Sequence, residues 1–178
     1  MKIYLLKKRE DFLKIFETSI RNFLKAKYPG NNYINNKYII NDHLNIIYPS
    51  KINRKKLVGL INEYKYHPKI YRKILQTFYA FLAIRWPLDI ILFSKKIIVP
   101  TPSIAKEDWV FIPGNHSIRI IDTEKNYCII FMKSGFDKKF FDSDTKVRLK
   151  YQWLKSPKII RKKTNWYEEE RVSGLPLD

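Results

Sequence analysis

The stretch 109-WVFIPGNHSIRIIDTEKNYCIIFMK-133 decides the fold of this chain. Its β-branched and aromatic residues alternate with period two, and residues 113–116 and 122–126 are of turn-forming types. The sequence therefore predicts an antiparallel meander with strands over Trp109–Ile112, Ile118–Ile121 and Tyr127–Met132.

Side chains along the third predicted strand alternate between its two faces. Tyr127, Ile129, Phe131 and Lys133 share one face, and Cys128, Ile130 and Met132 share the other. One face must meet a helix and the other needs a different cover. If one sheet face and the terminal segment are left uncovered, an exposed apolar patch is expected near residues 175–177. Such a patch would mark an interaction site.

Residues 134–178 continue with one helix and two strands. Apolar spacing predicts a helix over Asp142–Leu154, which Ser156-Pro157 ends. Short strands are predicted over Lys158–Ile160 and Trp166–Glu169, followed by a turn at residues 174–176. Residues 105–178 are thus predicted to form a five-stranded antiparallel sheet, with one helix between its third and fourth strands.

Residues 1–104 are predicted to form a mostly helical extension, which makes the chain α+β. Helical periodicity covers Asp11–Lys27, a region after Pro49, and Ile70–Trp86, where Ile74, Leu75, Phe78, Phe81 and Leu82 are expected to point inward. Pro87 is expected to end or kink that last helix. Residues 31–45 match no element firmly. Ile97–Val99 suggests a short strand, and Pro100-Thr101-Pro102 is the candidate domain boundary.

The chain is strongly basic, with a net charge of +18. Residues 1–104 carry 20 basic and six acidic residues, so most of the positive field belongs to them. Such a field attracts polyanions, either nucleic acid or an anionic membrane surface. The abundance of Ile, Asn, Lys and Tyr is typical of A/T-rich codon usage, which accounts for part of the lysine excess.

Cysteine usage and hydropathy favour a cytoplasmic protein. Cys128 is the only cysteine, so no intrachain disulfide can form. The most apolar stretch, Phe78–Phe93, contains Arg85 and Asp89 and is shorter than the ~20 apolar residues of a spanning helix. No transmembrane segment is therefore predicted, while peripheral attachment through an interfacial helix stays open.

Four segments after residue 105 carry a family resemblance. They are Phe111–Arg119, Ile129–Lys133, Lys158–Ile160 and Tyr167–Leu177, in the order strand, turn, strand, strand ending in lysine, helix, two strands and a Gly-x-Pro-like turn. This order resembles the small lobe of the protein-kinase-like fold, in the aminoglycoside phosphotransferase and choline kinase branch. The resemblance covers about 70 residues.

The resemblance implies ATP with Mg²⁺ as cofactor and five nucleotide-contacting residues. Gly114, Asn115 and His116 take the place of the phosphate-covering loop, and Lys133 that of the lysine on the α- and β-phosphates. Glu169 is the acidic residue before the linker turn. From the residues alone, the first three also fit an ordinary hairpin turn, and Lys133 a solvated strand end.

Two departures bear on activity. The helix that normally gives a glutamate to the lysine contains none here, and Asp142 and Asp144 are expected in its first turn as dipole partners. The family's catalytic and metal-binding aspartates belong to a large lobe that would follow Leu177. The resemblance therefore implies a truncated or split phosphotransferase, such as the remnant of a kinase for a sugar or lipid precursor, that is inactive alone and could pair with a separate large-lobe polypeptide.

The competing reading is a basic binding module. Lysine-rich segments at 51–56 and 65–73, with interleaved tyrosines, are typical of backbone contacts to nucleic acid as well as of a solvated helix face. A fragment without retained function is the third alternative. His43, His67, His116 and Cys128 lack the spacing of a zinc site.

Overall fold

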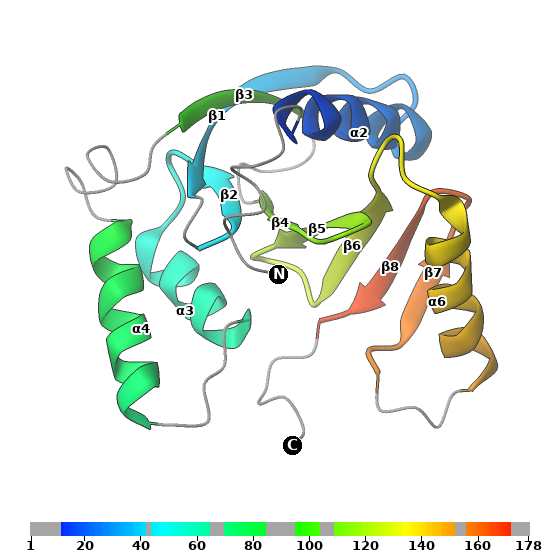
Figure 1. Ribbon diagram of the computed structural model, residues 1–178. Helices are drawn as coiled ribbons and strands as arrows, with labels where there is room; N and C mark the ends of the chain where they lie inside the picture. The colour runs from blue at the N-terminus through cyan, green and yellow to red at the C-terminus, as the bar shows by residue number, and fades with distance from the viewer. Residues whose placement is uncertain are drawn as a thin grey trace.

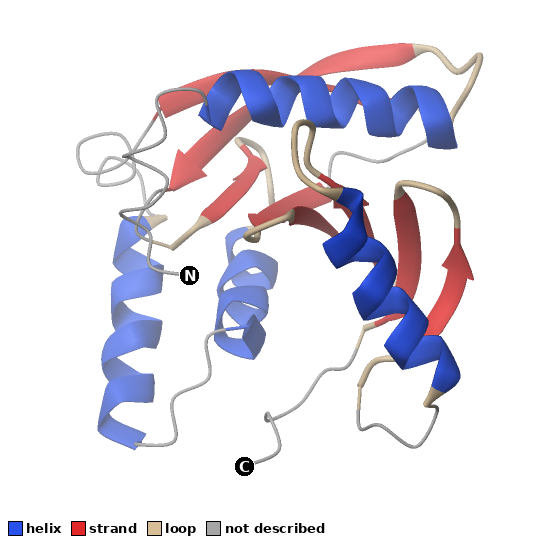
Figure 2. Ribbon diagram, turned by 45° about the vertical axis from the view of Figure 1, so that its right-hand side comes forward, coloured by secondary structure: helices blue, strands red, loops and turns tan. Residues whose placement is uncertain are grey.

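The computed structural model describes residues 12–41, 44–64, 70–84, 95–103, 109–151 and 156–171. These residues form an α+β structure, which confirms the predicted class. One antiparallel sheet of eight strands runs in the order β3-β1-β2-β4-β5-β6-β8-β7, and helices lie on both of its faces (Figures 1 and 2).

Five of the eight strands come from the C-terminal region. They are β4 (Trp109–Pro113), β5 (Ser117–Asp122), β6 (Tyr127–Met132), β7 (Ile159–Lys162) and β8 (Trp166–Glu170). The helix α6 (Lys138–Lys150) connects β6 to β7, and β8 returns between them. One helix does lie between the third and fourth of these strands, as predicted, but the five strands belong to an eight-stranded sheet, so the prediction of a five-stranded sheet is met only in part.

The other three strands lie in the N-terminal region, which was predicted to be mostly helical. They are β1 (Tyr33–Asn41), β2 (Ile46–Pro49) and β3 (Lys95–Pro102). The strand β3 contains the short strand predicted over Ile97–Val99, whereas β1 and β2 were not predicted. Period-two alternation is missing from β1, because its first half is largely exposed on both faces and its last four residues are buried on both. A strand with that burial pattern leaves no amphipathic signal in the sequence.

The sheet also continues across the candidate boundary at Pro100-Thr101-Pro102. Both prolines lie inside β3, where Pro100 pairs with Asn35 of β1. Proline lacks the N–H of a ladder bond, but β3 is an edge strand with only one neighbour, so it tolerates proline. On its other side β1 pairs with β2, and β2 in turn joins β4 through Ile47 and Phe111.

The helix α2 (Phe12–Lys27) confirms the first predicted helix and fills the concave face of the sheet. Figure 1 shows β1 and β3 on one side of α2 and β4–β6 on the other, so the sheet curves around the helix. Phe16, Ile20 and Phe23 pack in one cluster with Ile129 and Phe131. The rings of Phe23 and Phe131 stack at a centroid distance of 4.6 Å.

The opposite face of the sheet is covered by α3 (Arg54–Tyr64) and α6. Leu57, Leu60 and Ile61 of α3 and Phe141 of α6 share a cluster with Cys128 and Ile130. The predicted division of β6 into two faces is therefore confirmed. The face with Ile129 and Phe131 meets α2, and the face with Cys128 and Ile130 meets α3 and α6.

The helix α6 begins four residues before its predicted start. Asp137 is the N-cap and accepts a hydrogen bond from the backbone N–H of Lys139 at 2.9 Å. Asp142 and Asp144 consequently lie beyond the first turn, where they face Lys138 and Arg148 in i,i+4 ion pairs instead of the helix terminus.

The helix α4 (Ile70–Ala83) is present as predicted, but its expected inward face is not buried. Ile74 and Leu75 are each 63% exposed, Phe78 is 61% exposed and Phe81 is 47% exposed. The buried side is instead the narrow one with Ala80 and the following Ile84, on which α4 packs against α3. The exposed apolar residues extend over half of the helix circumference.

Among the described residues, no helix has the length and hydropathy that crossing a membrane requires. Several expectations lie outside the described residues. These are the kink at Pro87, the lysine-rich residues 65–69, His43, His67, and the apolar patch at 175–177.

Candidate functional site

The structure brings four of the five predicted nucleotide-contacting residues together. Gly114, Asn115 and His116 form the β4–β5 turn, which the bond from the Gly114 N–H to the Ser117 carbonyl closes at 2.8 Å. A Cβ at Gly114 would lie 3.1 Å from that carbonyl oxygen, so the tight approach favours glycine. Lys133 reaches this turn from the end of β6.

Lys133 is tied to the turn by both backbone and side chain. Its N–H donates to the His116 carbonyl at 3.0 Å, and its ammonium donates to the Gly114 carbonyl at 2.5 Å. The Asn115 carbonyl lies 3.4 Å from the same ammonium. A lysine that is only 1% exposed needs such partners, because a buried charge without hydrogen bonds is costly.

The first half of α2 covers Lys133. The ring of Phe12 lies 6.0 Å from its ammonium, and the hydroxyl of Ser19 accepts the Ser134 N–H at 2.8 Å. Lys133 thus lies on the α2 side of the sheet, whereas α6 packs on the other side. This placement differs from the family pattern, in which the small-lobe helix supplies the partner of the lysine.

Glu169, the fifth predicted residue, lies apart from this cluster. It pairs in register with Cys128, whereas Lys133 follows the opposite end of β6. Its buried carboxylate accepts from Arg119 of β5 and from Arg148 of α6, each at 2.8 Å. Glu169 therefore connects helix and sheet by ion pairs.

The network around Glu169 extends to the tyrosine two residues earlier. Arg148 donates to the Tyr167 hydroxyl at 3.2 Å, and that hydroxyl lies 3.3 Å from Asp144. Burial raises the pKa of Tyr167, so the phenol stays neutral. Burial by itself lowers the pKa of Arg148, but the hydrogen bond that Arg148 donates to Glu169 and the negative charges of Glu169 and Asp144 together outweigh it, so the net shift is upward.

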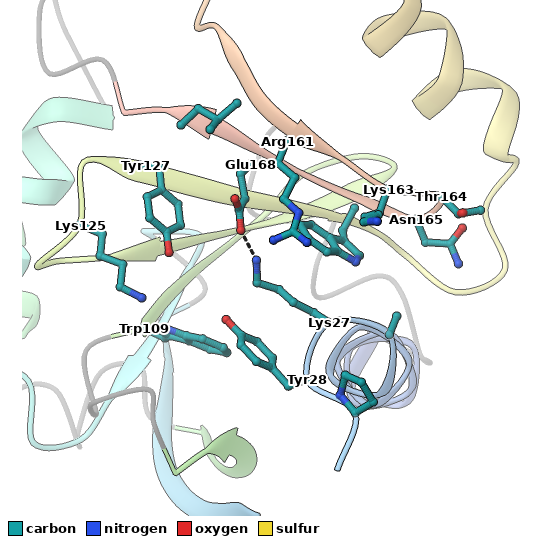
Figure 3. A pocket seen from close by; sticks show the side chains of 14 residues that line it. Lys27, Tyr28, Trp109, Lys125, Tyr127, Arg161, Lys163, Thr164, Asn165 and Glu168 are labelled. Carbon is teal, nitrogen blue, oxygen red and sulfur yellow. Dashed lines mark hydrogen bonds and ion pairs between the residues drawn. The ribbon is translucent and has the colours of Figure 1, made fainter. Parts of the chain in front are cut away.

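A feature that sequence reasoning missed is the basic pocket, an open cavity of about 810 Å³ where α2 ends against the sheet (Figure 3). Four cationic side chains line it: Lys27, Lys125, Arg161 and Lys163. Four aromatic rings line it as well: Tyr28, Trp109, Tyr127 and Trp166. Thr164, Asn165 and one carboxylate, Glu168, also contribute.

Trp166 and Glu168 hold the cations in place. The Lys27 ammonium forms an ion pair with Glu168 and lies 4.0 Å from the centre of the Trp166 ring. The guanidinium of Arg161 lies 5.6 Å from the same ring centre. Burial lowers the pKa of Lys27 and raises that of Tyr28. The residues come from four segments of the chain, 26–29, 109, 125–127 and 160–168, so no single local motif could have revealed the pocket.

Comparisons with known proteins give no relative for this chain. No protein-family model, no curated protein and no solved structure matches it. Its function must therefore be argued from the described geometry.

Proposed function

We propose that residues 109–171 are the small lobe of a kinase-like phosphotransferase. The supporting topology is a set of five antiparallel strands with α6 between the third and fourth. The observation that carries the proposal is the convergence of Lys133 and the 114–116 turn. A cation and a tight glycine turn, separated by 18 or 19 residues in sequence, meet within hydrogen-bond distance.

In this proposal the turn and Lys133 contact the phosphates of ATP bound with Mg²⁺. The Lys133 ammonium exchanges the carbonyls of Gly114 and Asn115 for phosphate oxygens, which form stronger, charge-assisted hydrogen bonds. The resemblance assigns the catalytic base and the metal-binding carboxylates to a large lobe, carried by the same polypeptide or by a partner. Turnover requires that lobe, so the small lobe by itself is expected to bind without phosphoryl transfer.

Calorimetric titration of the 178-residue chain with ATP and Mg²⁺ tests this proposal. We expect Lys133→Met to weaken binding about tenfold, the effect of losing roughly 1.4 kcal/mol of contact. Lys139→Met, at an exposed position of α6, is the matched control and should bind like the wild type. Circular dichroism verifies that both variants fold. A folded wild-type chain that binds no nucleotide would overturn the proposal.

A second candidate function, attachment to an anionic membrane, is favoured by α4. This helix exposes seven large apolar residues: Ile70, Tyr71, Ile74, Leu75, Phe78, Tyr79 and Phe81. Exposed lysine and arginine side chains at the neighbouring start of α3, Arg54, Lys55 and Lys56, supply positive charge. An apolar helix face near cations is the composition of interfacial helices that insert into anionic headgroups.

Sedimentation with lipid vesicles tests this second function. Binding is expected to vesicles that contain phosphatidylserine and to be lost in Ile74→Ser/Phe78→Ser, while vesicles of neutral phosphatidylcholine bind weakly. Equal sedimentation of the wild type and the double variant would exclude α4 as the contact. The two substitutions lie on an exposed surface, so the fold should tolerate them.

A further inference from the structure

We propose that the basic pocket binds a phosphorylated ring compound, the chemical class to which mononucleotides and sugar phosphates both belong. This site is separate from the cluster around Lys133. Lys27, the last residue of α2, lines the pocket, whereas Phe12, the first residue of that helix, lies over Lys133. The inference does not depend on nucleotide binding at Lys133.

The excess of positive charge in the pocket favours binding of an anion. Its four cations face a single lining carboxylate, Glu168, which the ammonium of Lys27 already engages. Lys125 lies 3.4 Å from Asp122, but no carboxylate of the described residues pairs with Arg161 or Lys163. A phosphate monoester carries a charge of about −1.5 to −2 at neutral pH and would neutralise this excess.

The cations are also held close enough to repel one another. After burial, the positive charges of Arg161 and Lys125 are among the causes that lower the pKa of Lys27. Lys27 and Arg161 both lie over the indole ring of Trp166. These cation–π contacts hold the two side chains in position before a ligand arrives. Preorganised cations lose little conformational freedom on binding, which favours affinity.

The aromatic side chains suit the ring of such a ligand. Figure 3 shows Tyr28, Trp109 and Tyr127 around the cavity, with Lys125 beside them. Trp109 is only 2% exposed, and no described residue accepts a hydrogen bond from its indole N–H. Because this nitrogen is itself buried, Trp109 contributes to the wall of the cavity and not a hydrogen bond to the ligand, and the exposed parts of Tyr28 and Tyr127 are left to contact a bound ring.

The dimensions agree with a small molecule. A volume of about 810 Å³ falls within the roughly 300–1,000 Å³ of small-ligand sites. Thr164 and Asn165 add neutral hydrogen-bonding groups at the rim beside Lys163. We place the phosphate of the ligand beside Arg161 and Lys163 and its ring beside the aromatic side chains. In this orientation the cationic, aromatic and neutral polar residues of the pocket all contact the ligand.

Titration calorimetry with the full chain tests the site. The probes are adenosine 5′-monophosphate, glucose 6-phosphate and inorganic phosphate. We expect at least one ring phosphate to bind more tightly than inorganic phosphate, and Arg161→Gln/Lys163→Gln to lose about tenfold or more in affinity. The matched control, Lys139→Gln/Lys146→Gln, removes the same charge from exposed positions of α6 and should change affinity less than about twofold.

The three probes distinguish the sources of the ligand. Preference for the nucleotide identifies a base-stacking site, and preference for the hexose phosphate identifies a sugar site; either outcome supports the proposal. Equal losses in the pocket and control variants would overturn it, as would binding of inorganic phosphate alone. Arg161→Gln/Lys163→Gln changes the pocket alone and Lys133→Met changes the cluster at the other end of α2, so failure here and failure of the kinase-like proposal are separable.

Discussion

The helices α2 and α4 are both amphipathic, but the apolar face of α2 is largely buried and that of α4 is largely exposed. Most apolar residues of α2 are buried against the sheet, whereas most of those on α4 face solvent. Helical periodicity predicted both helices and assigned both an inward face. The difference teaches that periodicity identifies the face that needs a partner but not the partner itself.

The difference arises because other helices already occupy both faces of the sheet. Its concave face holds α2, and its opposite face is already covered by α3 and α6. The helix α4 contacts α3 and lies farther from the sheet (Figure 1). A second-layer helix has only a narrow contact, so its broad apolar face is left for the membrane contact proposed above.

The largest expected effect comes from truncating an aromatic ring on α2. Phe23→Ala removes a ring that is 4% exposed and stacked on Phe131, so the free energy of unfolding should fall by about 3–5 kcal/mol. Urea denaturation followed by circular dichroism measures this change.

The same truncation on α4 sharpens the comparison. Phe78→Ala removes a ring that is 61% exposed and should change the free energy of unfolding by less than about 1 kcal/mol. Comparable losses in the two variants would mean that α4 is buried in solution by a partner, such as a second copy of the chain.

A smaller effect is expected from the polar anchor of α2. Ser19→Ala removes the acceptor of the Ser134 N–H in a buried position and should cost about 1–2 kcal/mol of stability. Thr18→Ala is the control, because its hydroxyl is exposed and, within the described part of the chain, bonds only to the Lys14 carbonyl of the same helix. If the control costs as much, the contact between Ser19 and Ser134 does not fasten the helix.

The smallest expected effect is a pH dependence at the last residue of α2. Burial lowers the pKa of Lys27 in the folded chain below 10.5, so the unfolded chain binds more protons as the pH approaches that value. Stability contributed by this group therefore rises with pH. We expect the stability of the wild type relative to Lys27→Gln to increase between about pH 8 and pH 10.

Denaturation curves at several pH values measure that difference. Lys25→Gln, in the same helical turn but exposed, supplies the reference series. A wild-type advantage over Lys27→Gln that falls with rising pH would contradict the assigned burial of Lys27.

Local patterns were sufficient for the C-terminal strands. The strands over β4, β5 and β6 alternate with period two because each presents a different buried cluster on each face, and their turns hold Gly114 and other turn-forming residues. The same patterns could not find β1, which is either exposed or buried on both faces along its length. The early start of α6 was missed because its N-cap, Asp137, is followed by two lysines and an exposed phenylalanine, Phe140, so the first turn shows no apolar face.

The five candidate nucleotide-contacting residues were grouped by the family resemblance, and the structure brings together those that are joined by short connections. Gly114 and Lys133 lie in adjacent hairpins, so local pairing is enough to bring them together. Glu169 was grouped with them by resemblance, but the register of β8 on β6 carries it to Arg119 and Arg148 instead. Register depends on the whole ladder and cannot be read from one strand.

The sequence by itself determined the α+β class, the meander, the two faces of β6 and the strong positive charge. Each of these follows from residue type and short-range spacing, which act within a few residues along the chain. Only the tertiary structure decided that α2 lies over Lys133, that α4 is exposed, and that Lys27, Lys125 and Arg161 surround one pocket. These outcomes depend on which surfaces are still uncovered when the layers pack, and that competition involves the whole chain at once.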